Sequence, residues 1–102
     1  MSTTRENSEL GKAWHSHVAG RDDSAVGEFE KLVEQSPQDF DALYGLGLAY
    51  RGANQYAKSI EIFKRLEEML EGEKPADEDD FNRLEMLKRM VNQQIHIVKS
   101  LT

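Results

Sequence analysis

Apolar residues recur every three or four positions along most of this chain, which is the spacing of a helix with one buried side. Glycine and proline interrupt the pattern at Gly20, Pro37, Gly52, Gly72 and Pro75, and residues of these types commonly end or separate helices. The stretches between them predict an all-α fold of about five helices. The last stretch, from about residue 77 to residue 101, predicts the longest helix.

The third stretch is the most apolar. It predicts a helix that begins near Asp39 and ends at Gly52, and apolar side chains nearly encircle this helix: Phe40, Leu43, Tyr44, Leu46, Leu48 and Tyr50. A helix that is apolar on all sides has to be covered by other elements. We expect it to be the most buried element of the fold.

Polar residues precede several stretches and are suited to cap helices, because their side-chain oxygens can accept hydrogen bonds from unpaired backbone N–H groups. A first helix is expected from about Ser8 to Ala19, and Asp22 and its polar neighbours offer caps for the second helix. Asn54 is the expected cap of the fourth helix. The acidic run from Asp77 to Asp80 places negative charge at the positive end of the last helix, which stabilises it.

The last helix carries apolar residues on two opposite sides. At about 100° per residue, one side holds Phe81, Leu84, Leu87, Val91, Ile95 and Val98, and the other holds Met86, Met90, Ile97 and Leu101. The first side is expected to pack on the fourth helix. The second would then be left to make a homodimer or to dock on a larger protein, and methionine suits an adaptable contact. The alternative is a frayed carboxyl end with scattered apolar residues.

A shift of 34 residues superimposes the first part of the chain on the second, with small residues falling on small ones and large on large ones. The pairs include Ala13 with Gly47, Ala25 with Ser59, Val26 with Ile60, Phe29 with Phe63 and Leu32 with Leu66. This period in helix-turn-helix units is typical of tetratricopeptide repeats, whose pattern reads W-x2-L-G-x2-Y, then A-x3-F, then P.

The second unit resembles that pattern, with Leu43, Leu46, Gly47 and Tyr50 followed by Ser59 and Phe63. Gly47 would let two helices approach closely, with Ser59 facing it and Phe63 filling the adjoining space. The first unit keeps Ala13, Ala25, Phe29 and Pro37 but has Glu9, Lys12 and Ser16 at the W, L and Y positions. The resemblance covers about Ser8 to Leu70 and implies antiparallel helix-turn-helix pairs, as in a fragment of an α-solenoid.

We expect a single domain over residues 1–102. Its expected parts are a flexible amino terminus (1–7), a first repeat (8–37), a second repeat (38–72), a linker (73–76) and a capping helix (77–102). A terminal cap is expected because such units cannot bury their faces alone.

The resemblance also implies a function. In tetratricopeptide-repeat proteins the first helix of each pair lines a concave groove that binds a peptide or a partner helix, which suggests a non-catalytic scaffold or adaptor. The corresponding positions are Leu10, Trp14, His17, Tyr44, Leu48 and Arg51, joined by Asn82, Met86 and Arg89 if the last helix also lines the groove. Leu10 and Trp14 are alternatively core residues of a rotated first helix. The clamp that some members use for a terminal carboxylate is missing, because its positions hold Leu10, Trp14 and Gly45.

Charge and composition narrow the class of partner. The net charge of −6 disfavours nucleic acid and acidic membranes, which proteins bind through Lys and Arg. The chain has no cysteine, so no disulfide framework is expected. Residues 1–9 are polar and unlike a secretory signal, and no stretch reaches the ~18 apolar residues of a membrane span. These features favour a cytoplasmic location.

No combination of residues suggests catalysis or a cofactor. His15 and His17 are two positions apart and point to different sides of a helix, and His96 stands alone. The acidic residues between Glu67 and Asp80 lack the spacing of a calcium loop and are better explained as a solvated, helix-capping run. We expect neither a metal site nor an active site.

Overall fold

The computed structural model describes residues 2–102, with side chains from residue 9 onward, and this part of the chain folds into five α-helices. They are α1 (Ser2–Val18), α2 (Asp22–Gln35), α3 (Phe40–Gly52), α4 (Tyr56–Gly72) and α5 (Glu78–Leu101). The all-α prediction and the long last helix are confirmed. The first helix begins earlier than predicted, at Ser2 and not at Ser8, so most of the segment predicted to be flexible is helical. Met1 lies outside the described residues.

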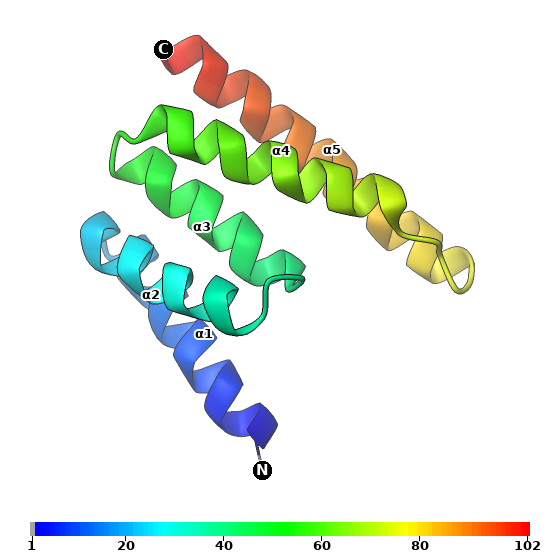
Figure 1. The fold of residues 1–102 in the computed structure, drawn as a ribbon, viewed down its shortest axis with the longest axis horizontal. Coiled ribbons are helices and arrows are strands. Elements are labelled where there is room, and N and C mark those ends of the chain that lie inside the picture. The colour runs from blue at the N-terminus through cyan, green and yellow to red at the C-terminus, as the bar shows by residue number, and fades with distance from the viewer. Residues whose placement is uncertain (1) are drawn as a thin grey trace.

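Consecutive helices run in opposite directions and stack into a thin body that measures 42 × 37 × 20 Å (Figure 1). In this view α1 lies behind α2, α5 lies behind α4, and α3 lies between the two pairs. The main contacts join each helix to the next one in the sequence, and α1 also touches α3.

Helix α3 forms the centre of the core, as predicted, and has more buried residues than any other helix of the described chain. Its two glycines each receive a phenylalanine ring from a neighbouring helix. Phe29 of α2 covers Gly45, and Phe63 of α4 covers Gly47, where a Cβ atom would lie 2.5 Å from the ring. The Ser59 hydroxyl donates a buried hydrogen bond to the carbonyl oxygen of Gly47 at 2.7 Å. The roles predicted for Gly47, Ser59 and Phe63 are therefore confirmed.

The turn between α1 and α2 has the same backbone hydrogen bonds as the turn between α3 and α4, displaced by 34 positions. The N–H of Gly20 donates to the carbonyl oxygen of His17, as the N–H of Asn54 does to Arg51. The same holds for Arg21 to Ser16 and Gln55 to Tyr50. It also holds for Ala25 to Arg21 and Ser59 to Gln55. Gly20 and Asn54 both have positive φ, 80° and 63°. Glycine adopts this conformation freely, and asparagine tolerates it better than most residues.

The caps predicted for α2 and α4 are not formed. The N-cap residues are Arg21 and Gln55, and neither side chain makes a capping hydrogen bond. Asp22 is already helical, and Asn54 lies in the turn, where its Oδ1 accepts a hydrogen bond from the Tyr56 hydroxyl at 2.9 Å.

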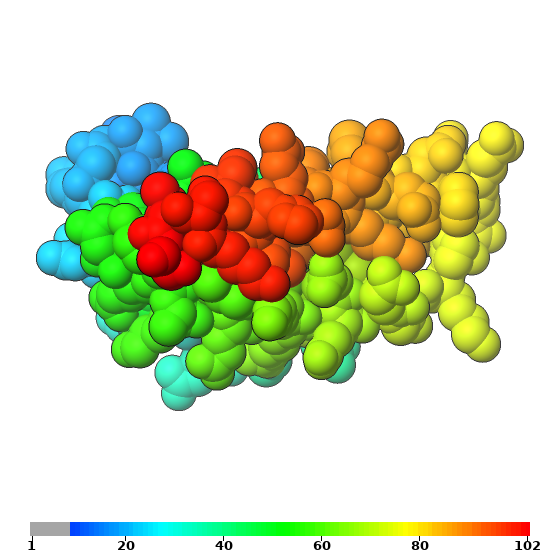
Figure 2. Space-filling model, turned by 90° about the horizontal axis from the view of Figure 1, so that it is seen from above, coloured from blue at the N-terminus to red at the C-terminus, as the bar shows by residue number. Residues whose placement is uncertain are grey.

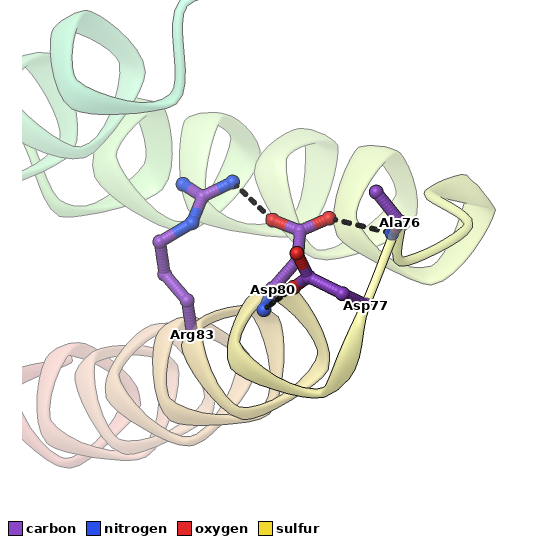
Figure 3. A network of polar contacts seen from close by, with 4 residues as sticks. All are labelled: Ala76, Asp77, Asp80 and Arg83. Carbon is purple, nitrogen blue, oxygen red and sulfur yellow. Dashed lines mark hydrogen bonds and ion pairs between the residues drawn. The ribbon is translucent and has the colours of Figure 1, made fainter.

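The start of α5 is held by a network of four residues, Ala76, Asp77, Asp80 and Arg83 (Figure 3). The Asp77 carboxylate accepts a hydrogen bond from the backbone N–H of Asp80 at 2.8 Å, which caps the helix. The Asp80 carboxylate in turn accepts from the backbone N–H of Ala76 at 3.0 Å and pairs with Arg83 at 2.8 Å. The Ala76 N–H, followed by Arg83, lowers the pKa of Asp80 below its ordinary value.

The Asp77→Ala variant is expected to lose about 1 kcal/mol of unfolding free energy, because it removes the capping acceptor. Urea unfolding followed by circular dichroism would measure the loss. Asp79→Ala is the matched control, because it removes one charge from the same turn and leaves the cap in place. An equal loss in both variants would mean that charge at the helix start matters and the capping hydrogen bond does not.

Candidate protein-binding surface

Three of the predicted groove residues come together where α1, α2 and α3 meet. His17 of α1 lines a cavity of about 350 Å³ with Leu48 and Arg51 of α3, and Asp22 and Gly52 complete its walls. We call this the Arg51 cavity. Its polar side chains come from α1, α2 and α3, so the fold of the helix pairs positions them.

The two ionisable groups on the α1–α2 side of the Arg51 cavity lie close together. The buried Nδ1 atom of His17 is 3.4 Å from the Asp22 carboxylate, at a geometry that does not make a hydrogen bond. The same carboxylate lies directly against Gly52, where any Cβ atom would collide with it. Sequence reasoning missed this role of Asp22, because the contact joins two helices and leaves no local pattern.

The predicted aromatic residues of the groove lie over the rings that fill the core. The ring of Trp14 meets the ring of Phe29 nearly edge-on, with centroids 5.1 Å apart, and the ring of Tyr44 meets Phe63 with centroids 5.7 Å apart. Trp14, Tyr44, Leu10 and Leu48 are all partly buried against the core. Leu10 and Trp14 therefore pack in part on the core, and their place in a binding groove stays a prediction.

Arg51 connects this region to α5. Its Nη1 atom donates a hydrogen bond to the side-chain oxygen of Gln94 at 2.9 Å. Gln94 was not among the predicted groove residues. No local pattern indicates this contact, because the two residues are 43 positions apart and the packing of α5 on α4 sets their register.

The second apolar side of α5 is accessible and lies next to Gln94. Met86, Met90 and Leu101 are 50%, 36% and 48% exposed, and Ile97 is partly exposed. Met90 and Ile97 lie about one turn on either side of Gln94, so they flank the Arg51 hydrogen bond. Figure 2 shows α5, in orange to red, uncovered along the side that faces the viewer. We call the Arg51 cavity together with Gln94 and these four apolar residues the Arg51 face.

The first apolar side of α5, which was predicted to pack on α4, is buried at most of its positions. Leu84, Val91, Ile95 and Val98 are buried, and Leu87 is partly buried. Phe81 departs from the prediction, because it is 49% exposed. It lies in the first turn of α5, and α4 has no apolar residue beyond Leu70 to cover it.

Comparison with known families assigns the centre of the chain. Residues 41–68, which span most of α3 and α4, match the family model of the tetratricopeptide repeat. This part of the chain is similar to one tetratricopeptide repeat. No curated protein sequence and no solved structure matches the chain. Tetratricopeptide repeats are generally non-catalytic and mediate contacts between proteins.

The α5 residues chosen by alignment to the tetratricopeptide pattern lie away from the Arg51 cavity. Arg89 lines a polar groove between α4 and α5 that also includes Glu67, Glu71 and His96. Because Arg89 and Gln94 are five positions apart, they point about 140° apart around the helix. Asn82 is exposed. Of the three aligned residues, only Met86 belongs to the apolar side of α5 that includes Met90 and Ile97.

Two further findings concern all of the described residues. From residue 2 to residue 102, none of the helices is both long enough and apolar enough to span a bilayer. Among the described side chains, no three histidine or carboxylate groups are placed together so as to hold a metal ion.

Proposed function

We propose that this chain is a protein-binding module and that the Arg51 face binds a segment of another polypeptide. The observation that carries the proposal is the Arg51 cavity, where the partly buried Leu48 lies with Arg51 and His17. The ring of Trp14, which packs on the Phe29 ring, meets the His17 ring with centroids 6.1 Å apart. Aromatic residues and arginine in such settings supply much of the binding energy at protein interfaces. Because the surface is largely formed by the fold itself, binding would require little further ordering.

We further propose that the first helix pair is a second, divergent repeat and that α5 caps the array. The matching turns, 34 positions apart, support this reading. So does the placement of Phe29, which is fully buried on α3 as Phe63 is. The proposed units are residues 8–37 and 38–72. A polypeptide is favoured over nucleic acid because the net charge is −6.

A phage library of random 16-residue peptides tests this function without a known partner. Peptides selected on the wild-type chain are expected to bind Leu48→Ala at least tenfold more weakly, because Leu48 forms the apolar wall of the Arg51 cavity. Fluorescence anisotropy with synthetic copies of the selected peptides would measure the change. Lys64→Ala, an exposed substitution on α4, is the control and is expected to bind like the wild type.

Selected peptides that are insensitive to Leu48→Ala would place binding elsewhere and contradict the proposal. Circular dichroism of the variant excludes a general loss of structure as the cause of weaker binding.

A second candidate function is self-association through the four exposed apolar residues of α5. Even if each were as large as an aromatic side chain, four half-exposed side chains would bury about 500 Å² per copy. The total for two copies only reaches the lower limit of a specific interface, about 1,000 Å². We therefore rank a homodimer below binding to another protein. Sedimentation equilibrium separates the two: a dimer abolished by Met90→Asp or Ile97→Asp would favour self-association.

A further inference from the structure

Among the described side chains Arg51 forms no ion pair with a carboxylate, although the Asp22 carboxylate lines the same cavity. Ion pairs of the described lysine and arginine side chains join Arg83 to Asp80 and Lys88 to Glu85, and the Asp22 carboxylate lies 3.4 Å from Nδ1 of His17. Arg51 instead donates to the neutral amide oxygen of Gln94. The chain has 19 acidic and 13 basic residues, yet the guanidinium group of Arg51 is bonded to a neutral amide. It can therefore still form an ion pair with a carboxylate of a partner.

The chemistry of the guanidinium group favours replacement of this amide. Arginine has five N–H donors in a planar fork that matches the two oxygens of a carboxylate. Hydrogen bonds between such charged groups are stronger than those to a neutral oxygen, particularly where apolar side chains exclude water. Leu48 beside Arg51, and Met90 and Ile97 on either side of Gln94, supply apolar side chains around this hydrogen bond, while His17 and Asp22 make the cavity side of Arg51 polar.

The spacing of the apolar residues indicates the shape of the partner. Met90 and Ile97 are seven positions apart, which is about 10 Å along a helix, and the whole stripe from Met86 to Leu101 extends about 22 Å. A partner helix that packs along α5 presents apolar residues at the same seven-residue interval. The Arg51–Gln94 hydrogen bond lies between the two apolar positions, three or four residues from each.

We infer that the Arg51 face binds an amphipathic helix with apolar residues at positions i and i+7 and an aspartate or glutamate at i+3 or i+4, whose carboxylate displaces Gln94 from Arg51. This inference rests on the proposed protein-binding function and adds the chemistry of the partner. The carboxylate is a side chain of the partner. It is not a chain terminus, because the bound segment continues along α5 on both sides of Arg51.

The display library described above supplies the probes, because its peptides are fused to the coat protein and have no free carboxyl terminus. Peptides whose binding depends on Leu48 are expected to share one acidic residue between apolar residues seven positions apart. A synthetic copy of the best peptide, amidated at its carboxyl end, would be compared with its Glu→Gln or Asp→Asn counterpart. We expect the neutral peptide to bind the wild type at least tenfold more weakly.

Variants of the chain then identify the group that reads the carboxylate. With Arg51→Gln the acidic and neutral peptides are expected to bind within threefold of each other. Arg83→Gln is the matched control, because Arg83 is already paired with Asp80, and it should preserve the full preference. Gln94→Ala removes only the competing acceptor, so binding of the acidic peptide should be unchanged or tighter.

The outcomes separate this inference from the function on which it rests. Peptides that depend on Leu48 but lack an acidic residue, or that tolerate its neutralisation, would overturn the inference and leave the protein-binding function in place. A preference for the acidic peptide that survives Arg51→Gln would also overturn it. If the library yields no peptide whose binding depends on Leu48, both the function and the inference fail.

Discussion

The Phe63→Ala variant is expected to lose about 3–5 kcal/mol of unfolding free energy. Phe63 is fully buried, and its ring is enclosed by the backbone at Gly47 and the ring of Tyr44. Glycine has no side chain that could move into the space left by the ring, so a cavity would remain in the centre of the core. Because domains of this size are stabilised by only about 5–15 kcal/mol in total, this loss would be a large share of the stability.

Urea unfolding at 25 °C, followed by circular dichroism at 222 nm, would measure this loss. Phe81→Ala is the matched control, because it makes the same substitution at a site that is 49% exposed. We expect it to cost less than about 1 kcal/mol, in line with the smaller area that Phe81 buries. Equal losses in the two variants would show that α5 packs more tightly at its first turn than the structure indicates.

The Gly45→Ala variant is expected to lose about 1–3 kcal/mol of stability, the usual cost of extra volume in a well-packed core. The added methyl group would overlap the ring of Phe29, which is itself fully buried and has no open space to occupy. This loss would outweigh the gain of about 1 kcal/mol that alanine normally brings to the interior of a helix.

Gly11→Ala is expected to change stability in the opposite direction. Gly11 lies on the exposed side of α1, with nothing within 4 Å of the position of a new Cβ atom. The substitution should therefore stabilise the chain by up to about 1 kcal/mol, measured by the same urea titration. A gain in stability for Gly45→Ala would show that the Phe29 ring can move aside, contrary to the close packing described above.

Helices and their buried sides could be predicted from the sequence because they follow from local periodicity. Phe29, Phe63 and Leu84 occupy the buried positions that the helical spacing assigned to them. Gly47 and Ser59 could be assigned because small residues, Ala13 and Ala25, occupy the positions 34 residues earlier. Each of these predictions depends on residues within one helix or one helix pair.

The residues whose role depends on contacts between distant helices could not be predicted in the same way. Asp22 resembled a helix cap, but its carboxylate is used against His17 and Gly52. Gln94 gave no signal, because its partner lies in α3 and the register between them depends on how α5 packs on α4. Arg89, chosen by alignment to the family pattern, lines the groove between α4 and α5, about 140° around the helix from Gln94.

The sequential arrangement of the helices has a consequence for how the chain folds. Since each helix packs chiefly on the one before and the one after it, few contacts require a long loop to be closed first. Proteins with such local contacts fold rapidly, typically within microseconds to milliseconds. In stacked arrays of this kind the central element has neighbours on both sides, so backbone amides of α3 should exchange with solvent deuterium most slowly, and those of α5, which has a major partner only in α4, sooner.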